Sequence, residues 1–286
     1  MRLKAYGKIN LGLDVVRKRE DGYHEVKMIM QNVGIYDRLE FEKTNNGKIA
    51  ISTNLSFLPV DQDNLIYKAA KLMMDTYNIK EGVSIKLEKH IPVSAGMAGG
   101  SSDAAATMVG LNNMFKLGLS VAELQKLGVK LGADIPYCIM RGTALSEGIG
   151  EILTPLPPMM KCPIIIAKPA ISVSTKFVYE NLRANELSYH PDIDGMVTAI
   201  KNQDLLGITN RMGNVLETVT AVKFPVIEQI KDNLKQNGAL NALMSGSGPT
   251  VFGIFDDKDR AEFACKELKK TELAKNVFLT EPVNFE

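Results

Sequence analysis

The feature that most constrains the fold of this 286-residue sequence is a glycine-rich segment between a predicted strand and a predicted helix. It reads Pro92-Val93-Ser94-Ala95-Gly96-Met97-Ala98-Gly99-Gly100-Ser101-Ser102-Asp103, and an alanine-rich stretch with high helix propensity follows it. Glycines leave backbone N–H groups open, and a helix N-terminus adds unpaired donors and the positive end of the helix dipole. The segment therefore predicts a phosphate-binding turn. The alternative is a tight strand-to-helix turn in which the glycines only permit packing.

The segment fits neither of two standard nucleotide-binding patterns. No Gly-Lys-Ser/Thr follows it, as a P-loop requires. Gly96, Gly99 and Gly100 do not match G-x-G-x-x-G. Neither a P-loop nor a Rossmann-type nucleotide site is therefore predicted.

The composition is that of an ordinary globular protein. Hydrophobic residues make up 45% and charged residues 23% of the chain, which excludes disorder, collagen and coiled coil. The formal net charge is +1, so no whole-molecule field steers the chain onto nucleic acid or anionic lipid. We therefore expect neither a nucleic-acid nor a membrane partner, and any anion site must be built locally.

The cysteines and the N-terminal residues predict a cytoplasmic location. Cys138, Cys162 and Cys265 are far apart and lack C-x-x-C spacing, so they predict neither a disulfide framework nor a zinc site. The first residues lack the apolar stretch of a secretory signal, and the apolar patches fall short of the about 20 residues that span a bilayer.

Alternation of apolar and polar residues predicts a strand over residues 8–15, with Lys8 and Asn10 on one face. Asp21-Gly22 predicts the tight turn of a hairpin, and Tyr23 and His24 begin the returning strand. Residue patterns and capping signals predict further strands at 38–43, 48–53, 83–88, 164–168, 239–244, 250–256 and 276–282. They predict helices at 65–77, 104–111, 120–131, 176–183, 193–201, 225–237 and 258–270.

A run of prolines predicts the domain boundary. It contains Pro155, Pro157, Pro158, Pro163 and Pro169. We expect an N-terminal domain over 1–157 and a C-terminal domain over 158–286. The mixture of strands and helices predicts the α+β fold class.

Three positions are candidates for chemistry. Asp134 places a carboxylate in Gly132-Ala133-Asp134-Ile135-Pro136, where it is a catalytic group or a turn aspartate. Ser245-Gly246-Ser247-Gly248-Pro249-Thr250 is a second glycine-rich turn, which contacts a ligand or only joins two strands. His24 is a site residue or a surface histidine of the hairpin.

Motifs along essentially the whole chain resemble the GHMP small-molecule kinases. The resemblance rests on Lys8-Ile9-Asn10-Leu11, on the glycine-rich segment, and on Met244-Ser245-Gly246-Ser247-Gly248-Pro249-Thr250, in that order. Within that family, the branch that phosphorylates a cytidine diphosphate-linked methylerythritol is similar in three more segments. These are Asp21-Gly22-Tyr23-His24, Gly132-Ala133-Asp134-Ile135-Pro136 and Glu147-Gly148-Ile149-Gly150-Glu151. The chain departs from the common family pattern at Ala95, Met97 and Ala98.

The resemblance implies a fold, a reaction and cofactors. It implies an S5-like N-terminal α/β domain that binds ATP and a ferredoxin-like C-terminal α+β domain. The implied reaction transfers the γ-phosphoryl group of ATP to the tertiary C2 hydroxyl of 4-diphosphocytidyl-2-C-methyl-D-erythritol, in non-mevalonate isoprenoid biosynthesis. Mg²⁺ is expected to enter with the phosphates, so no protein ligand is named for it.

The resemblance also implies residue roles. Asp134 matches the catalytic base and Lys8 its charge partner. The residues matching the ATP site are Pro92, Val93, Ser94, Ala95, Gly96, Met97, Ala98, Gly99, Gly100, Ser101, Ser102 and, more weakly, Asn64. Those matching the acceptor site are Asn10, Tyr23, His24, Ile149, Tyr179, Gly246, Ser247 and Gly248.

Two other functions compete with this one. A GHMP kinase for mevalonate or homoserine would lack the cytidine-reading set of Tyr23, His24 and Tyr179. A binding module is the second alternative, because the S5-like fold also occurs in RNA-associated proteins. The charge of +1 and the presence of both Lys8 and Asp134 argue against it.

Overall fold

The computed structural model describes residues 1–285, which form two compact units. The first unit contains residues 1–7, 35–93 and 98–140, and the second contains residues 8–34, 94–97 and the described chain from Arg141 onward. Two long strands, β1 (Arg2–Lys18) and β2 (His24–Thr44), contribute residues to both units. The glycine-rich segment is likewise divided, between Met97 and Ala98.

The predicted hairpin between β1 and β2 is confirmed. Its turn closes with a hydrogen bond from the Arg19 N–H to the Tyr23 carbonyl (2.8 Å), and Gly22 has a φ of +85°. The predicted returning strand and the strand predicted at 38–43 are one element, β2. The β-forming residues between them are interrupted by a single glycine, Gly34, which does not end the strand.

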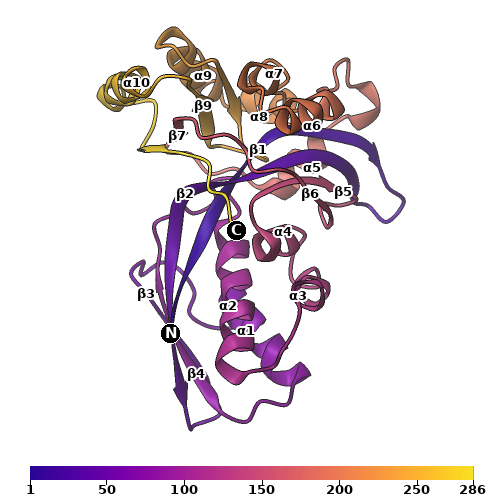
Figure 1. Ribbon diagram of the computed structural model, residues 1–286, viewed down its shortest axis with the longest axis vertical. Helices are drawn as coiled ribbons and strands as arrows, with labels where there is room; N and C mark the ends of the chain where they lie inside the picture. The colour runs from indigo at the N-terminus through magenta and orange to yellow at the C-terminus, as the bar shows by residue number, and fades with distance from the viewer. Residues whose placement is uncertain (286) are drawn as a thin grey trace. The chain divides into compact units, whose positions relative to one another are not determined.

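In the first unit, helices pack beside a short sheet (Figure 1). Strand β4 (Gly82–Glu88) pairs antiparallel with the 38–44 part of β2, and β3 (Ile49–Thr53) pairs parallel with β4. Helix α1 (Leu65–Thr76) connects β3 to β4 and packs on α2 (Gly99–Phe115). The core of this unit includes the fully buried side chains of Phe41, Met73, Ile85 and Leu111.

Side-chain caps fix where these helices begin. Asn64 caps α1 through its side chain, as its position before an apolar run predicts. The capping box of Ser120 and Glu123 begins α3 (Val121–Gly128), also as predicted. The predicted end of that helix at 131 is wrong, because residues 129–131 continue as separate turns.

A short helix that the sequence did not predict follows this one. Helix α4 (Ile135–Met140) begins at the residue before a proline, where a non-helical backbone was expected. Pro136 lies in the first turn, where the missing N–H costs no helical hydrogen bond.

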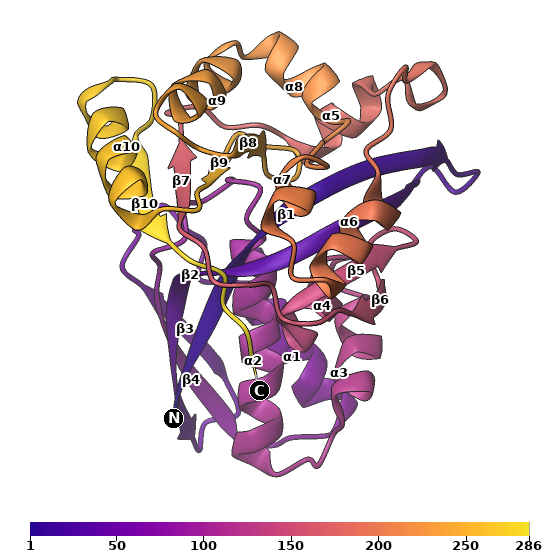
Figure 2. The same cartoon turned by 45° about the horizontal axis from the view of Figure 1, so that its top comes forward.

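In the second unit, an antiparallel sheet has the strand order β10-β7-β9-β8. Its strands are β7 (Ile164–Lys168), β8 (Asn241–Met244), β9 (Val251–Ile254) and β10 (Asn276–Thr280). Helices α9 (Val226–Gln236) and α10 (Lys258–Lys270) pack on it (Figure 2). The order β7-α9-β8-β9-α10-β10 is the split β-α-β arrangement, which confirms the ferredoxin-like expectation and the α+β class.

The second unit contains two further strands and several short helices. Strand β5 (Thr143–Glu147) pairs with β2 at Met28–Gln31 and with β6 (Ile152–Pro155). The helical elements are α5 (Thr175–Asn181), the 3₁₀ turn Ala184–Glu186, α6 (Ile193–Lys201), α7 (Leu205–Thr209) and α8 (Glu217–Lys223). The sequence predicted α5 and α6. It missed β5, β6, α7 and α8, whose residues give no clear periodic or capping signal and whose positions depend on packing with distant segments.

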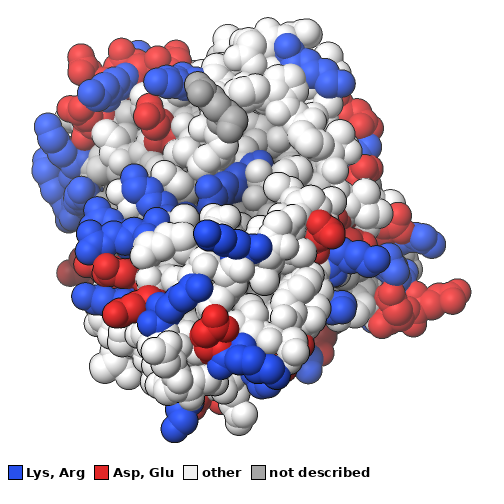
Figure 3. Space-filling view, turned by 60° about the horizontal axis from the view of Figure 1, so that its bottom comes forward, with Lys and Arg blue, Asp and Glu red and all other residues white. Residues whose placement is uncertain are grey.

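Charged side chains of both signs share one face of the molecule, and the cysteines are unpaired by disulfides. On the face drawn in Figure 3, Lys and Arg side chains lie among Asp and Glu side chains. Cys138, Cys162 and Cys265 are buried free thiols. Across residues 1–285, the helices fall short of the length and apolar character needed to cross a membrane.

The close contact between α2 and β2 generates a first prediction. A Cβ atom at Gly110 would lie 2.9 Å from Cζ of Phe41, whose ring is 2% exposed. Overpacking costs about 1–3 kcal/mol, which outweighs the about 0.5–1 kcal/mol that alanine gains over glycine in a helix. We expect Gly110→Ala to lower the free energy of unfolding in urea. Asn113→Ala, at an exposed position of the same helix, should change it by less than about 0.5 kcal/mol. Equal stability of Gly110→Ala and the parent would contradict this packing.

Candidate active site

Lys8 and Asn10 form a buried polar pair in the second unit. Both project from the same face of β1, as the alternation predicts, and they are 4% and 0% exposed. The Lys8 ammonium donates to Oδ1 of Asn10 at 2.7 Å, and Nδ2 of Asn10 lies 3.2 Å from the Met28 sulfur. A lysine and an amide are thereby held in fixed orientation inside an otherwise apolar strand.

The first part of the glycine-rich segment, residues 94–97, is fastened to this pair by backbone contacts. The Lys8 N–H donates to the Met97 carbonyl at 3.1 Å, and the Ser245 hydroxyl donates to the Gly96 carbonyl at 3.0 Å. A Cβ atom at Gly96 would lie 2.2 Å from the Ser245 carbonyl oxygen, and the φ of Gly96 is +71°. Glycine is therefore required here by both space and backbone conformation.

The second glycine-rich turn approaches the same lysine. At Gly246, whose φ is +58°, a Cβ atom would lie 3.5 Å from Oδ1 of Asn10 and 3.6 Å from Nζ of Lys8. Asn214, which the sequence analysis missed, holds this turn from behind. Its Nδ2 donates to the carbonyls of Met244 and Gly246, both at 2.8 Å. Nothing in the residues around Asn214 signals this contact, because its partners lie 30 and 32 positions away.

Two aromatic rings, those of His24 and Tyr179, pack against each other in the second unit. The rings of His24, on β2, and Tyr179, on α5, have centroids 5.2 Å apart and planes inclined by 39°. One helical turn before Tyr179, the Thr175 hydroxyl hydrogen-bonds the Ser247 hydroxyl at 2.8 Å. Helix α5 therefore contacts both the glycine-rich turn and His24. Thr175 was also missed, although its spacing of four from Tyr179 puts both on one helix face.

His24 is a buried, neutral imidazole. It is 8% exposed, and its Nε2 has no hydrogen-bond partner within residues 1–285. Burial lowers the pKa of His24 below its usual 6.5, and the nearby positive charge of Lys18 lowers it further. A buried polar atom without a partner is costly, so this nitrogen is suited to bind a ligand atom.

Tyr23 and Ile149 are two further predicted acceptor residues, and both lie in turns next to β2. Tyr23 is 60% exposed and immediately precedes β2, and its N–H donates to the Asp21 side chain at 3.0 Å. Ile149 is half-buried in the turn between β5 and β6. That turn is fixed to β2 by a hydrogen bond from the Val26 N–H to the Gly148 carbonyl (2.8 Å).

In the first unit, the start of α2 presents open backbone donors. Pro92 and Val93 precede the turn, and Ala98 occupies the N-cap with a φ of 53° and no side-chain cap. The N–H groups of Gly99, Gly100 and Ser101 belong to the first helical turn, which has no intrahelical acceptor for them. The Ser102 hydroxyl has a structural partner, because it donates to the Tyr6 carbonyl at 2.7 Å. This helix N-terminus fits a phosphate group.

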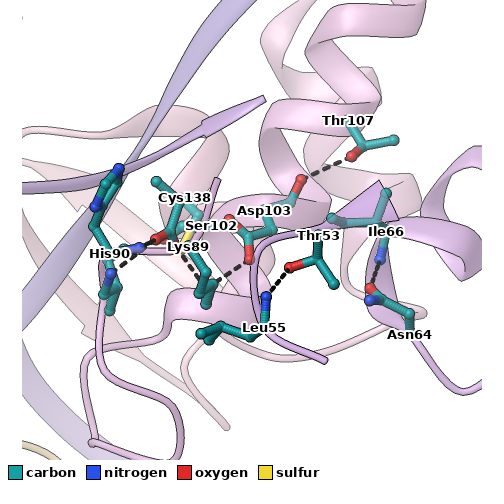
Figure 4. Close-up of polar contacts among 12 residues, drawn as sticks. Thr53, Leu55, Asn64, Ile66, Lys89, His90, Ser102, Asp103, Thr107 and Cys138 are labelled. Atoms are coloured by element: carbon teal, nitrogen blue, oxygen red, sulfur yellow. Dashed lines mark hydrogen bonds and ion pairs between the residues drawn. The ribbon is translucent and has the colours of Figure 1, made fainter. Parts of the chain in front are cut away.

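Asn64 and Asp134 also belong to the first unit. The side chain of Asn64 accepts from the Ile66 N–H (2.8 Å, Figure 4) and donates to the Pro59 carbonyl (2.7 Å). Asp134 is half-buried directly before α4, and its carbonyl accepts the Cys138 N–H at 3.0 Å. The structure therefore assigns Asn64 a capping role in α1 and places Asp134 at the start of α4.

Within residues 1–285, no group of three His, Cys, Asp or Glu side chains is placed to hold a metal ion. A divalent cation would have to take most of its ligands from a bound phosphate and water.

Comparison with known proteins gives matches along almost the entire chain. Residues 64–142 match the GHMP kinases N terminal domain, and residues 196–273 match the GHMP kinases C terminal domain. A 4-diphosphocytidyl-2-C-methyl-D-erythritol kinase of Lachnoclostridium phytofermentans is 59% identical over 97% of this chain and 96% of its own. A kinase of the same name from Lachnospira eligens is 54% identical over 98% of both chains.

The chain belongs to the GHMP kinase family. This GHMP kinase also superposes on a crystal structure of 4-(cytidine 5'-diphospho)-2C-methyl-D-erythritol kinase with a TM-score of 0.85, at 30% identity and with both chains fully covered. Homoserine kinase from Cytophaga hutchinsonii is 19% identical with a TM-score of 0.75, over 99% of this chain and 95% of its own. That likeness shows the shared fold alone. The two matched domains lie on either side of residue 157, where a domain boundary is predicted.

The close approach of Gly246 to Lys8 generates a prediction for this GHMP kinase. Gly246→Ala would strain a positive φ and press a methyl group against the Gly96 carbonyl, 3.2 Å away. Lys8 is predicted to be the charge partner of the base, and a displacement of about 1 Å at such a group costs about 10²-fold in rate. We expect kcat in a steady-state assay to fall by about that factor.

The matched control is Gly118→Ala. Gly118 has a φ of +71°, but a Cβ there meets nothing within 4 Å. It should lose stability without losing kcat. Equal kcat values for the two variants would contradict the prediction that activity requires a glycine at position 246, beside Lys8.

Proposed function

We propose that this GHMP kinase transfers the γ-phosphoryl group of ATP to the C2 hydroxyl of 4-diphosphocytidyl-2-C-methyl-D-erythritol. The observation that carries the proposal is the buried imidazole of His24, held against Tyr179 with an unpartnered Nε2. The proposal agrees with the names of relatives that are 59% and 54% identical to the chain. The reaction belongs to non-mevalonate isoprenoid biosynthesis, for which a cytoplasmic location is expected.

The His24 and Tyr179 pair suits a cytosine base. A cytosine edge carries both donors and acceptors, which a neutral imidazole can meet with one nitrogen of each kind. The Tyr179 ring offers a face for stacking. Tyr23 and Ile149 would add apolar contact at the edge of the base.

The glycine-rich segment suits the triphosphate of ATP. The open N–H groups at the start of α2 and the left-handed turn at Ser94 and Gly96 provide donors without side-chain obstruction. ATP supplies the phosphoryl group, and Mg²⁺ is expected to accompany its phosphates. In this proposal residues 92–102 orient the phosphates. Gly246, Ser247 and Gly248 border the acceptor.

We assign the proton and charge chemistry to three side chains. Asp134 accepts the proton of the C2 hydroxyl as the hydroxyl oxygen attacks the γ-phosphorus. Lys8 supplies the cation that stabilises the negative charge developing during transfer. Asn10 holds Lys8 in place through the 2.7 Å hydrogen bond described above and orients the acceptor.

Mevalonate and homoserine are the competing acceptors. Neither carries a base that would bond to Nε2 of His24 or stack on Tyr179. Either acceptor would therefore leave Nε2 of His24 buried without a hydrogen-bond partner. A binding module without turnover would not need both Lys8 and Asp134.

The decisive experiment measures ADP release with ATP, Mg²⁺ and each acceptor in parallel: 4-diphosphocytidyl-2-C-methyl-D-erythritol, mevalonate and homoserine. We expect turnover with the cytidyl acceptor alone. Asp134→Asn should lower kcat by about 10²- to 10⁴-fold while ATP affinity is kept, because a positioned base contributes that much. Asp75→Asn, on the exposed side of α1, is the control and should retain full activity. Turnover on another acceptor would refute the cytidine assignment, and an active Asp134→Asn would refute the base.

The lowered pKa of His24 generates a separate prediction. Because its pKa lies below 6.5, the imidazole is neutral at pH 7, and protonation at lower pH converts its acceptor nitrogen into a donor. We expect the KM for the cytidyl acceptor to be constant from pH 8 to 6.5 and to rise as the pH falls further. The KM for ATP should not follow that rise.

His24→Gln is the control variant, because an amide hydrogen-bonds without titrating. Its acceptor KM should be higher but independent of pH over the same range. A pH-dependent rise of equal size in this variant would assign the titration to another group.

A further inference from the structure

A buried ionic cluster lies beside the start of α2 in the first unit. The Lys89 ammonium contacts Oδ2 of Asp37 at 2.5 Å and Oδ2 of Asp103 at 2.6 Å. The three side chains are 5%, 0% and 5% exposed. Figure 4 shows Lys89 and Asp103 directed toward one another, from the segment after β4 and from α2. The roles proposed above use none of these three residues.

The cluster joins both ends of the segment that leads into α2. Oδ1 of Asp37 accepts hydrogen bonds from the backbone N–H groups of His90 (2.5 Å) and Ile91 (2.8 Å). These residues immediately precede Pro92. Asp103 lies at the fifth position of α2. Lys89 therefore connects Asp37 of β2, which also holds the backbone of His90 and Ile91, to Asp103 in the first turns of α2.

Gly99 accommodates this lysine. A Cβ atom at Gly99 would lie 2.9 Å from Nζ of Lys89 and 3.0 Å from Cγ2 of Ile91. At the next position, Gly100, the nearest atom to a Cβ is Cδ1 of Leu65 at 3.4 Å, an ordinary van der Waals distance. The two adjacent glycines thus differ in their surroundings, because a side chain at position 99 would collide with Lys89 and one at position 100 would not.

A single buried ammonium group faces two carboxyl groups in the cluster. Burial opposes the charge on Lys89, but the attraction of the two carboxylates outweighs it, so the pKa of Lys89 is raised. Burial raises the pKa of Asp103 well above its usual range, against the opposing effect of Lys89. Oδ1 of Asp103 also has no hydrogen-bond partner within residues 1–285. Lys89 thus bonds to one carboxyl oxygen from β2 and one from α2.

We propose that Lys89 is a positioning residue for nucleotide binding. By bonding to Asp37 and Asp103 it sets the orientation of the first turn of α2, and with it the open N–H groups of Gly99, Gly100 and Ser101. The proposal rests on the proposed function for the identity of the ligand, ATP. A buried ion pair adds little net stability, but loss of one partner leaves an uncompensated buried charge. The geometry of the turn, rather than the stability of the fold, is what the pair provides.

The first test replaces Lys89 by methionine, with Lys86→Met as the matched control. Lys86 is exposed on β4, three residues earlier, so the control removes the same group from the surface. A misplaced binding group costs about 10- to 100-fold. We expect Lys89→Met to raise the Kd of a fluorescent ADP analogue and the KM for ATP by that factor. The KM for the cytidyl acceptor should stay within about twofold. Lys86→Met should change neither.

The second test keeps the lysine and crowds it. Gly99→Ala and Gly100→Ala add the same methyl group to neighbouring positions of the nucleotide-binding turn. We expect Gly99→Ala to raise the Kd of the ADP analogue by about tenfold. Gly100→Ala also adds a methyl group to the phosphate-binding turn, but it does not meet Lys89, so its loss of affinity should be clearly smaller than that of Gly99→Ala. This pair also decides the matter if Lys89→Met does not fold, since neither alanine removes a charge.

Two outcomes overturn the proposal. One is a folded Lys89→Met with nucleotide affinity within twofold of the parent, or with both substrate KM values raised alike. The other is an equal loss of affinity in the two alanine variants, which would trace the effect to phosphate crowding. The binding assay needs no acceptor, so it remains decisive even if the parent enzyme fails to phosphorylate the cytidyl acceptor. That failure would refute the proposed function alone.

Discussion

The second unit depends on a backbone approach that only glycine permits. Residues 94–97 and the turn after β8 come so close at Gly96 that any side chain there would overlap the Ser245 carbonyl. The contact places the Gly96 carbonyl under the Ser245 hydroxyl and leaves Gly246 facing the Lys8 and Asn10 pair. The same approach covers the Lys8 ammonium, and a buried charge is tolerated only where polar groups surround it.

Local signals predicted the elements well because their physical causes are local. The hairpin at Gly22, the cap of α1 by Asn64 and the capping box of Ser120 each involve residues within a few positions of one another. The missed elements lack such local causes. The positions of strand β5 and helix α7 are decided by pairing and packing with distant segments.

The candidate site shows the same division. Lys8 and Asn10 were predicted to share a strand face, and the glycines were predicted to mark close backbone approach. The residues that hold them in place were not predicted. Asn214 acts across 30 positions of sequence and Lys89 bonds to Asp37 across 52, so neither has a local pattern. The roles of Asp134 and Tyr179 rest on family resemblance, because an isolated aspartate or tyrosine fits many structural positions equally well.

Helix α5 joins two contacts within the second unit. Thr175 bonds to Ser247 in the turn beside Lys8, and Tyr179, one turn later, lies against His24. Four residues of α-helix rise about 6 Å, and a helix resists stretching because its length is set by its hydrogen bonds. The helix therefore acts as a rigid spacer between the turn after β8 and the His24 ring, so that neither of them can shift along the helix axis without the other.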